Sequence, residues 1–163
     1  YVYGNQINEE RMKQYIKQHL ERGETVNASI WARQYLEFCL IKIVRKLGIR
    51  VPIDLSTREE KRMIKNLLHA IKYEIDIHKR LGDLILTSEQ ENLLVSRLIG
   101  NLASHYETSS TTELLPEAVV GVVKEIDEFI QAFKYTCNCG DKPKKIFYKS
   151  LYEKQKGCGK NCF

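Results

Sequence analysis

The sequence predicts an all-α protein, a bundle of four to five helices with a small cysteine-rich appendage at its C-terminal end. Apolar residues recur at helical spacing in five segments, and no long stretch before residue 134 alternates apolar and polar residues as a strand would. Four of the five cysteines lie beyond residue 134. A chain of 163 residues that is 43% hydrophobic can bury one core, so we expect one main domain.

The first two helices are expected at residues 8–22 and 27–47. Met12, Ile16 and Leu20 recur four residues apart, with Asn8 as a cap before them and Gly23 as a stop after them. The second segment is apolar on most of its circumference, so we expect it in the middle of the bundle.

Capping boxes and a proline mark the remaining helices. The third opens near residue 56 at a Ser/Thr-x-x-Glu capping box and ends near Gly82. The fourth opens at Ser88 with Glu91, and its apolar stripe is Leu94, Leu98, Leu102 and Tyr106. Pro116 suits the first turn of the fifth, whose stripe is Val119, Val122, Val123, Ile126, Phe129, Ile130 and Phe133.

The charge of the chain is uneven. The formal net charge is +5, but residues 1–133 are close to neutral. Residues 134–163 hold eight lysines against Asp141 and Glu153. We therefore predict three parts: an N-terminal helix (1–24), the helical bundle (25–135) and a basic cysteine-rich tail (136–163).

Several classes of protein are not expected. No apolar run approaches the ~20 residues of a membrane helix, and no secretory signal is visible, so we expect a cytoplasmic protein without a membrane partner. Glycine-rich phosphate loops are absent, so we expect no nucleotide site. Because the chain begins with Tyr1, we expect it to be a piece of a longer protein.

The most specific motif lies in the fourth predicted helix. Arg97, Asn101 and His105 are spaced four and four, which forms a slanting stripe along one side of the helix. Gly100 costs about 1 kcal/mol in mid-helix, which indicates close approach of another helix or a bound group. One interpretation is a buried Asn101–His105 hydrogen-bonded pair that orients two helices.

This motif resembles a branch of the HEPN superfamily with the pattern Arg-x-x-Gly-Asn-x-Ala-x-His. The chain matches it at Arg97, Gly100, Asn101, Ala103 and His105. A second resemblance is Ala-Arg-x-x-Leu-Glu at residues 32–37, and the likeness covers about residues 25–133. Many HEPN proteins are metal-independent endoribonucleases of bacterial defence, with sites built across a dimer.

The resemblance implies two functions. Gly100 stands where the ribonuclease motif has Arg, and Arg97 precedes His105 by about 12 Å of helix. We therefore expect a nucleic-acid-binding or assembly module without an intact ribonuclease motif, within a larger bacterial defence protein that could carry an upstream ATPase. The alternative is an endoribonuclease in which a homodimer joins His105, as acid/base, to Arg97 of the second chain. A purely structural dimerisation domain is the third hypothesis.

The tail holds two close pairs of cysteines, Cys137 with Cys139 and Cys158 with Cys162. Four thiolates can hold structural zinc, and the neighbouring glycines permit tight turns. The pattern resembles a small zinc ribbon, although Cys-x-Cys and Cys-x-x-x-Cys replace the stronger Cys-x-x-Cys pairs. Two disulfides and four reduced thiols are the alternatives, and a reducing cytosol favours metal over disulfides.

The segment between the two cysteine pairs is rich in basic and aromatic residues. Lysines can contact phosphates and aromatic rings can stack on bases, so we predict a contact surface for RNA or another nucleic acid, formed by Lys144, Lys145, Phe147, Tyr148, Lys149 and Tyr152. A solvated lysine-rich terminus is the alternative.

Overall fold

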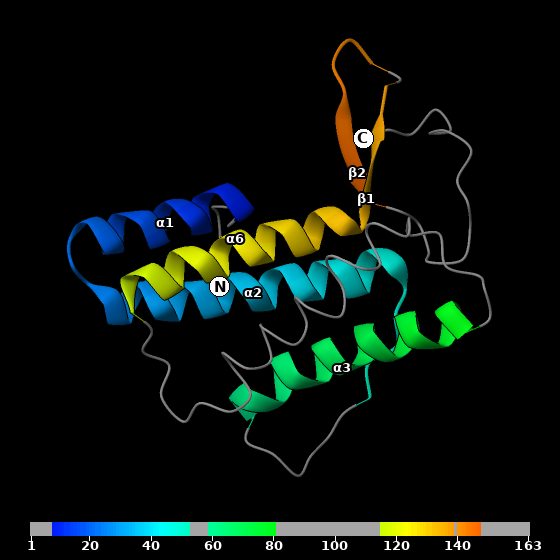
Figure 1. Cartoon of the computed structure of the whole chain (residues 1–163), viewed down its shortest axis with the longest axis horizontal. Coiled ribbons are helices and arrows are strands. Elements are labelled where there is room, and N and C mark those ends of the chain that lie inside the picture. The colour runs from blue at the N-terminus through cyan, green and yellow to red at the C-terminus, as the bar shows by residue number, and fades with distance from the viewer. Residues whose placement is uncertain (1–7, 53–58, 81–114, 139, 148–163) are drawn as a thin grey trace.

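The computed structural model describes residues 8–52, 59–80, 115–138 and 140–147, with side chains left out at 59–63 and 78–80. This part of the chain forms four helices and one two-stranded antiparallel sheet (Figure 1). The elements are α1 (Glu9–Glu21), α2 (Thr25–Leu47), α3 (Glu59–Arg80), α6 (Pro116–Ala132), β1 (Lys134–Cys137) and β2 (Lys144–Phe147).

Helix α1 begins and ends where its sequence signals indicate. The Asn8 side chain accepts a hydrogen bond of 2.9 Å from the backbone N–H of Arg11, which caps the first turn. Gly23 follows with φ +73°, a left-handed conformation that reverses the chain into α2. Met12 and Ile16 are buried, as their four-residue spacing predicts.

Helix α2 is the centre of the bundle and contacts α1, α3 and α6. Its buried side chains cover much of its circumference, which confirms the central place expected from its composition. It begins at Thr25, two residues before the predicted start, and ends at Gly48 with φ +64°. Figure 1 shows α1 and α6 on one side of α2 and α3 on the other.

Helices α3 and α6 present apolar stripes to the same core. The α3 stripe and the α6 stripe are buried at Ile64, Leu67, Leu68, Ile71, Ile75, Val119, Val122, Ile126, Phe129 and Ile130. Pro116 stands in the first turn of α6, as predicted. The helical-bundle class is therefore confirmed for the described part of the chain. None of its helices combines the length and apolarity needed to cross a membrane.

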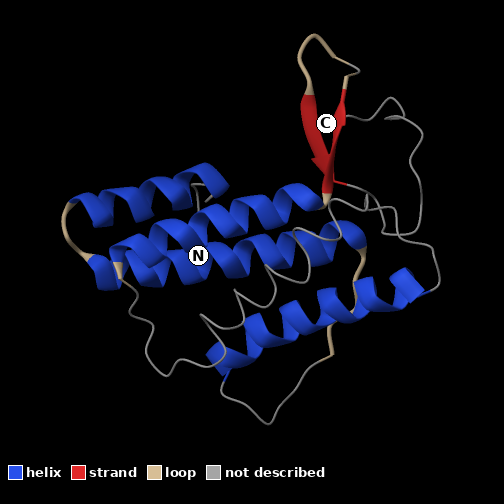
Figure 2. Cartoon of the chain, viewed as in Figure 1, coloured by secondary structure: helices blue, strands red, loops and turns tan. Residues whose placement is uncertain are grey.

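The sheet is a short hairpin that leaves the end of α6 (Figure 2). Phe133, the C-cap of α6, is fully buried, and β1 starts at the next residue. The hairpin therefore begins two residues before the predicted tail. Its second strand falls in the basic and aromatic segment between the cysteine pairs.

Candidate nucleic-acid interface

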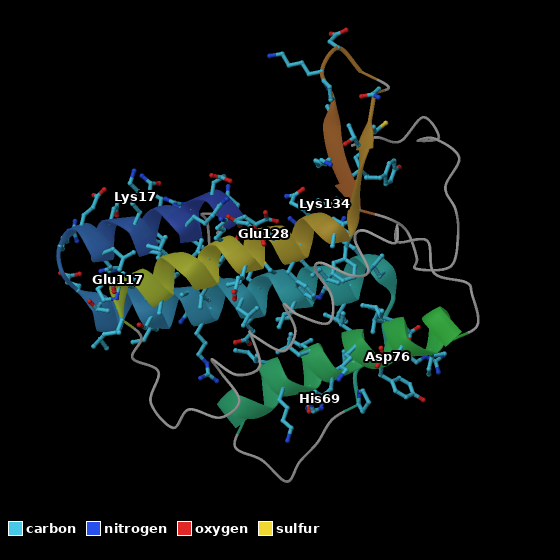
Figure 3. All side chains as sticks on the ribbon, viewed as in Figure 1. Lys17, His69, Asp76, Glu117, Glu128 and Lys134 are labelled. Atoms are coloured by element: carbon cyan, nitrogen blue, oxygen red, sulfur yellow. The ribbon has the colours of Figure 1, made fainter. Side chains whose placement is uncertain are left out.

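The hairpin carries more lysines than acidic side chains. Lys142, Lys144 and Lys145 are exposed, and Lys134 is half-buried at its base. Asp141 is the only acidic residue between 134 and 147 in the sequence. Figure 3 shows Lys134 where the hairpin leaves α6, and the strands extend from there beyond the helices. Lysines gathered on a projecting element can approach a polyanion without a clash between the polyanion and the bundle.

The register of the hairpin sets which side chains share a face. Opposite residues are Lys134 with Phe147, Tyr135 with Ile146, Thr136 with Lys145, and Cys137 with Lys144. Because directly opposite residues of antiparallel strands point to the same side, Lys144 and Lys145 lie on different faces. Lys144 and Lys145 were both predicted as contact residues, but their side chains are therefore not neighbours on one surface.

Phe147 anchors the hairpin to the bundle. Its ring packs against the edge of the core. The ammonium of Lys134 lies 4.8 Å from the ring centroid, and that of Lys42 on α2 lies 5.8 Å from it. These are cation–π distances. The placement favours an anchoring role for Phe147 over the base-stacking role that the sequence indicated.

Cys137 is the one predicted metal ligand that lies within the described residues. It ends β1 and is 5% exposed. Cys139, Cys158 and Cys162 lie outside the described residues. Within the described part, no group of three or more His, Cys, Asp or Glu side chains could hold a metal. With three of its four ligands outside that part, the zinc site stays a prediction.

Several other predicted residues also lie outside the described part of the chain. Arg97, Asn101 and His105, the HEPN-like stripe, fall in residues 81–114. The contact residues Tyr148, Lys149 and Tyr152 follow the end of β2. Their predicted roles rest on the sequence.

A polar cluster joins α1, α2 and α6. The buried Tyr35 of α2 donates a hydrogen bond to Asp127 of α6. Lys13 of α1 approaches the same carboxylate, with 3.6 Å between Nζ and Oδ2. Lys42 of α2 donates to Glu9 of α1 over 2.8 Å. The cluster therefore cross-links three helices with charged and polar groups.

This environment shifts the pKa values of its members. Burial raises the pKa of the Cys39 thiol to about 12, and the Glu9 carboxylate adds to the rise. Burial, with Cys39 and Asp127 nearby, also raises the pKa of Tyr35. Burial alone would lower the pKa of Lys13, but its hydrogen bond to Glu10 and the charge of Asp127 raise it. A thiol with a raised pKa is a poor nucleophile at neutral pH, so Cys39 acts as a core residue.

Tyr35 and Cys39 are both fully buried in the core. The sequence motifs did not indicate that Asp127, 92 residues further along the chain, is the partner of Tyr35. A carboxylate one residue after the buried Ile126 was the available signal, because it lies at the edge of the apolar stripe of α6.

Comparison with protein-family models, with curated proteins and with solved structures found no match to this chain. The resemblance to the HEPN superfamily therefore rests on the motifs described above.

Proposed function

We propose that this chain is a nucleic-acid-binding module whose contact surface is the basic hairpin. The observation that carries the proposal is the set of exposed lysines, Lys142, Lys144 and Lys145, on an element that projects from a nearly neutral helical body. Lysine contacts to phosphates supply sequence-independent affinity, and their geometric demands are small. The body holds the hairpin through Phe147 and Phe133.

The wider setting of the proposal comes from the sequence. The HEPN-like motif favours an assembly module of a larger cytoplasmic bacterial defence protein that acts on RNA or another nucleic acid as a homodimer. The endoribonuclease alternative depends on Arg97, Asn101 and His105.

Salt-dependent RNA binding tests the proposal. Fluorescence anisotropy would follow a labelled single-stranded RNA of mixed sequence over a range of salt concentrations. We expect the logarithm of the association constant to fall linearly with the logarithm of salt concentration. Replacing Lys142, Lys144 and Lys145 together with alanine should lower that slope by about 0.7 for each lysine that contacts a phosphate.

A charge-matched variant gives the control. Lys46 on α2, Lys72 on α3 and Lys124 on α6 are also exposed, and their replacement with alanine removes the same charge from the helices. Its binding should stay close to wild type. If the two triple variants weaken RNA binding equally, the effect is due to net charge alone. If the hairpin variant binds RNA as tightly as wild type, the hairpin is not the contact surface. Metal-independent RNA cleavage that is lost with His105→Ala would establish the endoribonuclease alternative.

A further inference from the structure

We infer that the phosphate backbone lies along one face of the hairpin only, the face of Lys134, Thr136 and Lys145, which we call the open face. This inference rests on the proposed function and names the part of the hairpin that meets the nucleic acid. It follows from the strand register and the unequal burial of the two faces.

The register fixes the residues of the open face. The pairs Lys134–Phe147 and Thr136–Lys145 point to one side of the sheet, and Tyr135–Ile146 and Cys137–Lys144 point to the other. The cation–π contact of Lys134 with Phe147 agrees with this assignment, because both side chains must be on the same side to meet.

The two faces differ in burial at their outer halves. On the open face, Thr136 and Lys145 are both exposed, whereas on the second face Cys137, opposite the exposed Lys144, is 5% exposed. At the base, Lys134 and Phe147 on the open face and Tyr135 and Ile146 on the second face are all half-buried. A nucleic-acid strand can therefore lie against both Thr136 and Lys145, whereas the outer half of the second face offers Lys144 alone.

The open face also continues onto the helical body. At its base, the ammonium groups of Lys134 and Lys42 both lie over the Phe147 ring, so this face meets α2 there. Lys42 is paired with Glu9, which leaves Lys134 and Lys145 as the cations available to phosphates on this face. Lys134 and Lys145 are diagonal neighbours, about 7–8 Å apart at their Cα atoms.

Two adjacent lysines of β2 give a matched test. Lys145→Ala removes a charge from the open face, and Lys144→Ala removes one from the second face. A phosphate contact that contributes about 0.7 to the salt slope is equivalent to about fivefold in affinity at 0.1 M salt. We expect Lys145→Ala to weaken binding to the labelled RNA by about that factor and Lys144→Ala to leave both affinity and slope near wild type.

A third variant separates binding from folding. Thr136→Glu places a carboxylate directly opposite Lys145, where an opposite-charge pair favours the hairpin. It should weaken RNA binding at least as much as Lys145→Ala without lowering the thermal midpoint, and Thr136→Gln should bind like wild type.

The outcomes distinguish this inference from the proposed function. If RNA binding depends on the hairpin but Lys144→Ala and Lys145→Ala weaken it equally, the one-face inference is wrong and the proposed function stands. If wild-type protein does not bind RNA, both are wrong. Lys145-dependent binding to phosphatidylserine vesicles that exceeds binding to RNA would replace nucleic acid with an anionic membrane as the partner and overturn the inference.

Discussion

Tyr35 connects the apolar core to the charged cluster on α1 and α6. Its ring is fully buried, and its hydroxyl reaches Asp127, which is also held by Lys13. A hydrogen bond to a charged acceptor contributes about 1.5–3 kcal/mol, more than a neutral pair does. At the scale of single residues, this bond is a polar link between α2 and α6.

Replacing Tyr35 with phenylalanine should therefore destabilise the fold. The variant keeps the ring in the core and removes only the hydroxyl, so we expect a loss of about 1.5–3 kcal/mol in the free energy of unfolding. Urea denaturation followed by circular dichroism measures it. Tyr73→Phe is the control, because the Tyr73 side chain is 64% exposed and its change should stay within about 0.5 kcal/mol.

The pH dependence of this difference provides a second readout. The pKa of Tyr35 is raised in the folded state, so above its ordinary value of 10.0 the unfolded chain loses a proton that the folded chain retains. The stability due to Tyr35 is fully present below pH 10.0 and falls as pH rises. The difference in the free energy of unfolding between wild type and Tyr35→Phe should consequently become smaller above pH 10.0. A gap that widens there, or none at neutral pH, would contradict this role of Tyr35.

At the scale of elements, two glycines allow the effect of backbone strain on stability to be distinguished from the effect of packing. Gly48 ends α2 in the left-handed region, whereas Gly121 lies within α6, and a Cβ atom at either position would meet nothing within 4 Å. Because space is equal, only backbone conformation differs between the two sites.

The same substitution should therefore have opposite effects at these sites. Gly48→Ala should cost about 1–2 kcal/mol, because an L-residue is strained at φ +64°. Gly121→Ala should stabilise the protein by up to about 1 kcal/mol, because alanine has the higher helix propensity. Thermal unfolding of both variants measures the pair, and a stabilising Gly48→Ala would show that the end of α2 is free to rearrange.

Local sequence patterns were sufficient to predict where the described helices lie, but not which side chains join them. The four-residue spacing of Met12 and Ile16 and the stops at Gly23 and Gly48 depend only on nearby residues, so they placed α1 and α2 correctly. The Tyr35–Asp127 bond joins distant parts of the chain, and the position of Asp127 at the edge of the α6 stripe does not identify Tyr35 as its partner.

The candidate site shows the same division between local and distant information. The lysines at 144 and 145 were predicted as contact residues from composition, and both are exposed. Their separation onto two faces depends on strand pairing, and the contact of Phe147 with Lys42 depends on how the hairpin meets α2. Neither could be read from the basic and aromatic composition of the segment.

At the scale of the whole molecule, the two described cysteines divide between the helical body and the hairpin. Cys39 lies within α2 and belongs to the core cluster, whereas Cys137 ends β1 at the start of the basic tail. The zinc hypothesis requires Cys137 together with Cys139, Cys158 and Cys162, and it assigns no role to Cys39.

Metal analysis of protein purified under reducing conditions should find one zinc ion for each chain. Cys137→Ser should abolish zinc binding, because tetrahedral structural sites need all four ligands. Cys39→Ala should retain the metal, even if it lowers stability, because its thiol is part of the core of the body. A chelator should expose four thiols of the wild-type protein to a thiol reagent, with loss of zinc at the same rate. A metal content near zero, with the tail thiols reduced and reactive from the start, would contradict a zinc-bound tail.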